Sequence, residues 1–183
     1  MLELSIALPI RVQNGGLFIS RGVGRHPARK LSSWEIIFVE KGTLTIQEEN
    51  TLFEVNAGES LLLWPKRRHV GVEDFPGDLK FYWLHFEVDE RLPALPGATP
   101  LSIEQHCSVR DPQYVIALFR QFLSEQEKLQ RSQALEIILL LILQQISLSP
   151  GYEDKADDAG AAMAWKAKQL IRTHFHLPLS TSQ

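Results

Sequence analysis

A series of short apolar stretches, separated by turn residues, constrains the fold of this chain more than any other feature. They lie between residues 17 and 88 and read LFIS, WEIIFVE, TLTIQEE, TLFEV, SLLLW, HVGVE and KFYWLHFEV. Each is rich in β-branched and aromatic residues, and turn signals such as KG at 41–42 and FPGD at 75–78 separate them. Strands at a spacing of about ten residues predict an antiparallel sandwich or barrel. A parallel βαβ sheet is not expected, because no helical stretch interrupts the series.

Residues 111–148 follow a helical pattern instead. Asp111 and Pro112 form a good helix start, because aspartate accepts hydrogen bonds at the N-cap and proline suits the first helical position. Apolar residues then recur at helical spacing: Val115, Leu118, Phe119, Phe122 and Leu129. A second helix is predicted in SQALEIILLLILQQISL at 132–148. The predicted fold class is therefore mainly β with C-terminal helices, an antiparallel β-barrel followed by a helical pair.

The second predicted helix carries two apolar stripes. One comprises Leu135, Ile138, Leu139, Ile142, Leu143 and Ile146, and the other comprises Ile137, Leu140, Leu141 and Leu148. Two stripes mean that the helix is buried on more than one side. A second copy of the chain would cover the second stripe, so we expect a homodimer through Ile137, Leu140, Leu141 and Leu148. The alternative is that the first helix and the sheet cover both stripes.

Composition and charge narrow the classes of function. The 183 residues carry a formal net charge of -3, which lacks the basic excess of most nucleic-acid binders. The single cysteine, Cys107, excludes a disulfide within one chain. The N-terminus lacks the features of a signal peptide, and the apolar run IILLLIL is shorter than the roughly 20 residues that span a bilayer. We predict a cytoplasmic protein with no membrane partner.

Catalytic motifs are scarce. The sequence has no glycine-rich phosphate loop, no GxSxG and no HExxH motif. His174 and His176 are two positions apart, so on a regular helix they point about 200° away from each other and do not share a metal ion. No catalytic residue, metal ligand or cofactor is predicted.

The stretch FYWLHFEV at 81–88 predicts a strand with aromatic residues on both faces. Alternation places Phe81, Trp83 and His85 on one face and Tyr82, Leu84 and Phe86 on the other. We expect one face to pack on helices and the other to line the barrel interior. Tryptophan, histidine and a nearby arginine would suit a small polar ligand, although Trp83 and His85 could equally fill the core.

Basic residues precede two of the predicted strands. RGVGRHPARK at 21–30 and PKRRHVG at 65–71 are read mainly as solvated loops. One inward arginine could bind hydroxyls or a carboxylate with its rigid fork. His69 begins a strand and could point into the mouth of the barrel.

The ordered set WEIIFVEKG, VNAGESLLLWPKRRH and FYWLHF resembles the cupin-like N-terminal domain of AraC-family transcriptional regulators. The resemblance covers about residues 17 to 88. The resemblance implies a cupin-like jelly roll that binds a small effector, a sugar in arabinose-type members, and helices that dimerise. It implies ligand-binding roles for residues that match the family's pattern: Arg29, His69, Phe81, Trp83 and His85. Phe81 departs from the arabinose regulator, which has a polar residue there, so arabinose itself is not expected.

The resemblance also implies a domain plan. Residues 1–16 would form an N-terminal arm, 17–95 the cupin-like β-barrel sensor and 96–148 the dimerisation helices. Residues 149–160 would form a linker. Residues 161–183, with AWKAKQLIRTHFHLPLSTSQ, look like the first helix of a truncated helix-turn-helix domain. The longer regulator would then bind DNA, whereas this fragment alone would not.

Two other functions stay open. The wider cupin superfamily includes metal-dependent isomerases and dioxygenases. Their HxH ligand pair would fall near SSWEI, where Ser32, Ser33 and Trp34 supply no imidazole, so His69 would remain the lone ligand and no enzyme is expected. The other alternative is a structural dimerisation module whose barrel is filled by side chains and binds no ligand.

Overall fold

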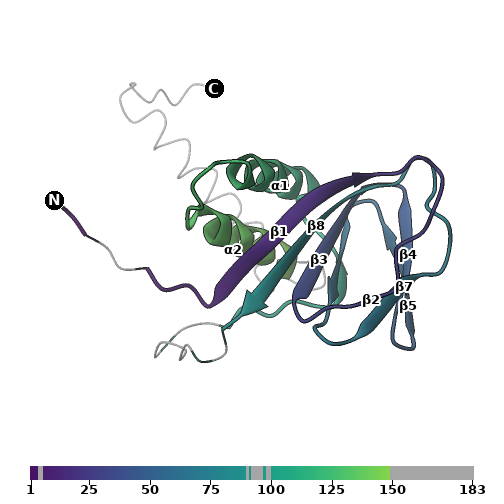
Figure 1. The fold of residues 1–183 in the computed structure, drawn as a ribbon, viewed down its shortest axis with the longest axis horizontal. Helices are drawn as coiled ribbons and strands as arrows, with labels where there is room; N and C mark the ends of the chain where they lie inside the picture. Colours follow the sequence, from purple (N-terminus) through teal and green to yellow (C-terminus); the bar gives the residue numbers. More distant parts are fainter. Residues whose placement is uncertain (4–5, 90, 92–96, 98–99, 149–183) are drawn as a thin grey trace, which may run out of the picture. The chain divides into compact units, whose positions relative to one another are not determined.

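The computed structural model describes residues 1–3, 6–89, 91, 97 and 100–148. The strands are β1 (Ile10–Ile19), β2 (Arg29–Lys30), β3 (Trp34–Lys41), β4 (Thr43–Glu48), β5 (Thr51–Asn56), β6 (Glu59–Leu63), β7 (Arg68–Gly71), β8 (Lys80–Val88) and β9 (His106–Ser108). The helices are α1 (Pro112–Gln126) and α2 (Ala134–Ser147). These elements are drawn in Figure 1. The predictions for residues 149–183, which include the linker, the last helix and His174 with His176, lie outside the described residues.

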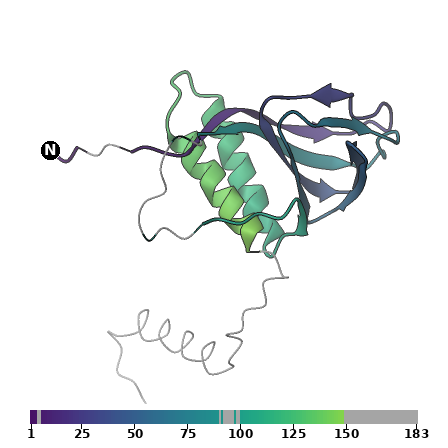
Figure 2. The ribbon, with the colours of Figure 1, turned by 90° about the horizontal axis from the view of Figure 1, so that it is seen from below.

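The strands form two antiparallel sheets. One sheet has the order β1-β8-β3-β6-β9, and the other has the order β2-β7-β4-β5. The five-stranded sheet packs against the four-stranded sheet on one face and against both helices on the other. Figure 2 shows α1 and α2 side by side along that second face. This jelly-roll-like arrangement confirms the predicted fold class, mainly β with C-terminal helices.

The first strand begins earlier than expected. Residues 10 to 16 belong to β1, in which Ile10 pairs with Val88 and Gly16 with Trp83 on β8. The register shifts between Val12 and Asn14, which marks a bulge in the strand. The predicted arm over residues 1–16 therefore overlaps the sheet. The sequence QNGG at 13–16 has a weak preference for strands, because asparagine and glycine favour turns. It is nevertheless part of β1, because the long neighbouring strand β8 pairs with its backbone.

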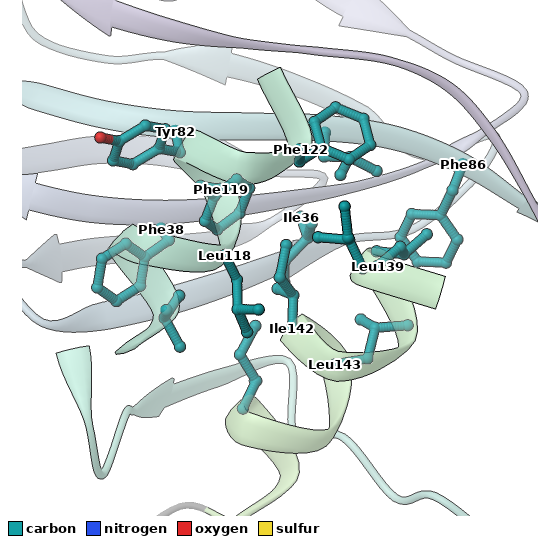
Figure 3. Close-up of a cluster of buried hydrophobic side chains, with 14 of the residues drawn as sticks. Ile36, Phe38, Tyr82, Phe86, Leu118, Phe119, Phe122, Leu139, Ile142 and Leu143 are labelled. Atoms are coloured by element: carbon teal, nitrogen blue, oxygen red, sulfur yellow. The ribbon is translucent and has the colours of Figure 1, made fainter. Parts of the chain in front are cut away.

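The two faces of β8 contribute to two separate cores, as the alternation predicted. Tyr82, Leu84 and Phe86 face the helices. Phe81 and the partly buried Trp83 face the space between the sheets. Figure 3 shows the helix-side core, where side chains from β3 and β8 meet Leu118, Phe119 and Phe122 of α1 and Leu139, Ile142 and Leu143 of α2.

The helices start and pack largely as their sequences predict. Asp111 caps α1, and its Oδ1 accepts a hydrogen bond of 3.0 Å from the Tyr114 N–H. The first stripe of α2 is fully buried. In the second stripe, Ile137, Leu141 and Leu148 are exposed, whereas Leu140 is partly buried against the helix-side core. Among the described residues, neither helix is long and apolar enough to cross a membrane.

Candidate functional site

A buried glutamate lies at the centre of the barrel interior. Glu35 on β3 is only 3% exposed, and it points inward with Ile37 and Val39, the alternate residues of the same strand. Its Oε1 lies 3.5 Å from Nε2 of His85, the residue opposite it on β8. Its Oε2 lies 3.7 Å from Nε2 of His69 on β7, in the facing sheet. Glu35 therefore faces one histidine of its own sheet, His85, and one of the facing sheet, His69.

A third histidine reaches this cluster from the segment between β1 and β2. His26 is buried, and its ring centroid lies 5.3 Å from that of His69. The Gly71 N–H donates a 2.9 Å hydrogen bond to the His26 carbonyl, which fixes this segment against the end of β7. A Cβ on Gly71 would lie 2.5 Å from the His26 nitrogen, so the close approach requires glycine.

Burial and neighbouring charges set the protonation of the cluster. Burial lowers the pKa of His26 and of His69, and the opposing charge of Glu35 does not restore either. Burial acts to raise the pKa of Glu35. The hydrogen bond and charge of His85, together with the charges of His26 and His69, outweigh that effect and lower it. The shifts favour the ionised form of Glu35 and the neutral forms of His26 and His69.

A cavity of about 170 Å³ adjoins this cluster. It is lined by Phe18, His26, Pro27, Arg29, Glu35, Phe75, Phe81 and Trp83. Phe18 stacks on Phe81 with ring centroids 4.8 Å apart, so one wall is flat and apolar. Glu35 supplies an acceptor and Arg29 a fixed positive charge with several donors. A mostly apolar cavity with a few convergent polar groups has the character of a small-molecule site.

A second hollow, of about 360 Å³, lies between α2 and the five-stranded sheet. Trp34, Trp64, Leu140 and other apolar residues line it, without a charged side chain. It therefore offers surface for apolar contact but no side-chain charge that would orient a polar ligand. The barrel cavity is the better candidate for an effector site.

The structure brings the five predicted ligand-binding residues into one region. Arg29, Phe81 and Trp83 line the cavity. His69 and His85 lie on either side of Glu35, and Arg29 is opposite His69 in the β2–β7 pair. Their ligand-binding role stays a prediction.

Several residues of this region were not predicted from the sequence. Glu35, His26, Phe18 and Phe75 line the cavity as well. Alternation along WEIIFVEK could have revealed Glu35, because it is the charged member of the inward set that includes Ile37 and Val39. The sequence predicts a solvated loop at His26, whereas its side chain is buried and only 5% exposed. No local pattern indicates it, since its position depends on Gly71 in a distant strand.

The expectation that His69 would be the lone available metal ligand was wrong. Ligand atoms of His26, Glu35 and His69 all lie within 4.8 Å of one another. The imidazole comes from His26 in the segment before β2, and not from the positions of Ser32 and Ser33. Two imidazoles and a carboxylate fit the ligand preferences of first-row transition metals.

Together, the jelly-roll-like barrel, the mixed polar and aromatic cavity and the packed helical pair define a cupin-like ligand-binding domain. The chain belongs to the AraC-like ligand binding domain family, which matches residues 20–143. Over 77 residues it is 38% identical to the HTH-type transcriptional regulator YisR of Bacillus subtilis (strain 168), itself uncharacterized. The match covers 39% of this chain and 27% of that regulator, so the chain spans well under two thirds of its relative's length.

Solved structures with related folds are distant. A cupin protein from Bacteroides fragilis is 15% identical, with a TM-score of 0.36 over 55% of this chain and 97% of that one. The Cnp3 cupin domain of Schizosaccharomyces pombe is 7% identical, with a TM-score of 0.36 over 47% of this chain and 69% of that one.

Proposed function

We propose that this chain is the effector-sensing and dimerisation domain of an AraC-type, DNA-binding transcriptional regulator of the cytoplasm. Membership of the AraC-like ligand binding domain family and the likeness to an HTH-type regulator support the regulatory role. The observation that carries the sensing role is the cavity, in which Arg29 and Glu35 meet an aromatic wall. DNA binding would belong to parts of the regulator beyond the described barrel and helices.

The cavity's size and lining restrict the effector. Its volume of about 170 Å³ is below the roughly 300–1,000 Å³ of pockets for drug-sized ligands. Arg29 would bind a carboxylate or vicinal hydroxyls through its guanidinium fork. Trp83 and Phe81 would cover an apolar face of the ligand. A sugar, a sugar acid or a small hydroxy acid meets these requirements.

Strand β8 provides a direct physical connection from the cavity to the helices. Trp83 lines the cavity, and its neighbour Tyr82 on the opposite face stacks on Phe119 of α1 with ring centroids 5.0 Å apart. An effector that prefers one position of β8 would shift the population of helix arrangements by its differential affinity. A change at the cavity would thereby alter how two protomers pair.

A thermal-shift screen of sugars, sugar acids, organic acids and aromatic acids tests the sensing role. An effector at 100 times its dissociation constant stabilises the folded chain by about 2.7 kcal/mol. We expect Arg29→Ala to abolish the shift. The matched control Arg25→Ala, whose guanidinium pairs with Asp74 on the surface, keeps it.

The contrary result is equally clear. If no compound shifts the melting temperature and calorimetry detects no heat of binding, the structural dimerisation module becomes the better account. If hits stabilise Arg29→Ala as much as the wild type, binding occurs outside the barrel cavity and the assigned site is wrong.

A further inference from the structure

We propose that His26, Glu35 and His69 bind one divalent transition-metal ion inside the barrel. The three side chains come from separate parts of the chain: the segment before β2, β3 and β7. Their exposed fractions are 5%, 3% and 1%, so they are removed from solvent. Their ligand atoms lie within 4.8 Å of one another. The inference does not depend on the identity of an effector or on the proposed regulatory role.

Unpartnered polar atoms support the site. Glu35 Oε2 and both ring nitrogens of His69 are buried and have no hydrogen-bond partner among the described residues. Buried polar atoms in folded proteins almost always have partners, so these three indicate that something else completes the cluster. A cation would satisfy Oε2 and one nitrogen of His69 together, whereas a hydrogen bond between them would require a distance below the observed 3.7 Å.

The surroundings resemble the outer shell of a metal site. His85 engages Oε1 of Glu35 and leaves Oε2 directed at His69. Ser33 Oγ in turn lies 3.3 Å from Nδ1 of His85 and orients that ring. Such second partners fix the orientation of ligating side chains in metalloproteins. His85 and Ser33 are thus assigned as positioning residues for Glu35.

Charge and geometry determine the class of ion. A buried carboxylate is costly unless a cation compensates it, and Glu35 Oε2 has no hydrogen-bond partner among the described residues. Two imidazoles and one carboxylate favour Zn²⁺, Fe²⁺, Co²⁺ or Ni²⁺ over Ca²⁺ and Mg²⁺, which prefer oxygen ligands. With metal–ligand bonds of about 2.1 Å, tetrahedral ligand atoms are about 3.4 Å apart. The 3.7 Å between Glu35 Oε2 and His69 Nε2 is already close to that separation, so binding requires small side-chain movements.

The adjoining cavity gives the ion room for a further ligand. His26 and Glu35 line that cavity, so an ion between them faces its interior. A water molecule or an oxygen of a bound small molecule would complete the coordination.

Metal titration of the chelator-stripped, untagged full chain tests the site. We expect calorimetry with ZnCl₂ to give a stoichiometry of one ion per chain. The protein loaded with Co²⁺ should show the visible absorption bands of a four- or five-coordinate ion. Glu35→Gln and His69→Gln should each weaken Zn²⁺ binding by at least about tenfold. The control His106→Gln, whose ring pairs with Glu59 away from the cluster, should bind Zn²⁺ like the wild type. Circular dichroism establishes that each variant is folded.

A measurement on the wild type avoids dependence on variants. X-ray absorption of the zinc-loaded chain should show nitrogen and oxygen neighbours with the scattering pattern of two imidazoles. Absence of stoichiometric Zn²⁺ and Co²⁺ binding overturns the proposal. Binding that survives His69→Gln but disappears in the double variant His174→Gln and His176→Gln also overturns it, because the ion would then lie elsewhere.

Discussion

Gln126 at the end of α1 exchanges two hydrogen bonds with the backbone of Gly15 in β1. Its side-chain oxygen accepts from the Gly15 N–H at 2.7 Å, and its amide donates to the Gly15 carbonyl at 3.0 Å. The glutamine thereby takes the place of a neighbouring strand, since β1 is the edge of its sheet. The backbone of Val12 in β1 makes similar hydrogen bonds. Its N–H donates to the Glu136 carboxylate, and its carbonyl accepts from the Arg131 guanidinium. The helical pair thus covers part of an edge that would otherwise be open to another chain.

Replacing Gln126 should destabilise the fold measurably. Gln126→Ala leaves a buried N–H and carbonyl of Gly15 without partners, which costs about 1–3 kcal/mol. Urea unfolding followed by circular dichroism measures this loss. Gln121→Ala on the exposed side of α1 is the matched control, and a change within about 0.5 kcal/mol is expected there. Equal effects of the two substitutions would contradict the role given to the Gly15 contact.

Gly71 should tolerate no side chain. In Gly71→Ala the new Cβ would meet the His26 backbone at 2.5 Å, so the segment before β2 must move, at a cost of about 1–3 kcal/mol. Gly77→Ala is the control, because its Cβ would meet only Gly22 at 3.9 Å. The comparison is made by urea unfolding. A Gly71→Ala variant as stable as Gly77→Ala would show that His26 is not held where we describe it.

The exposed stripe of α2 should mediate dimerisation. Leu141→Glu places a charge in the expected interface, so the dimer dissociation constant should rise at least about tenfold, equivalent to about 1.4 kcal/mol. Sedimentation equilibrium measures it. Leu52→Glu on β5 makes the same chemical change at an exposed leucine outside the helices and should leave association unaltered. A wild-type chain that is monomeric at all concentrations would refute the dimer.

The contact between Glu59 and His106 should stabilise the folded state at neutral pH, and this contribution should be lost in acid. Burial acts to raise the pKa of Glu59, but the Asn56 N–H and His106 outweigh it, so the pKa is lowered from 4.5. A lowered carboxyl pKa stabilises the folded state above 4.5, and that contribution disappears as pH falls through the folded value. Wild type and Glu59→Gln should therefore differ in free energy of unfolding at about pH 5.5, and the difference should shrink as pH falls from 4.5 through the lower folded pKa. A difference that persists in strong acid would exclude this origin.

Local patterns in the sequence were sufficient for much of the fold. Alternation along FYWLHFEV assigned Phe81 and Trp83 to the interior and Tyr82 to the helix side, because each strand residue points opposite to its neighbours. The cap at Asp111 and the buried stripe of α2 were likewise predictable, because a helix repeats every 3.6 residues. These features depend on residues close together in the chain.

The polar centre of the barrel and the edge of β1 were decided by tertiary structure. His26 becomes a buried neighbour of Glu35 and His69 only because its segment crosses the end of β7. Gln126 meets Gly15 across 111 positions of sequence. The backbone of β1 becomes ordered through β8 and these helix side chains rather than through its own weak strand preference. Such contacts depend on which distant segments become neighbours in the folded chain. The spacing of residues within one strand or helix does not indicate which segments those are.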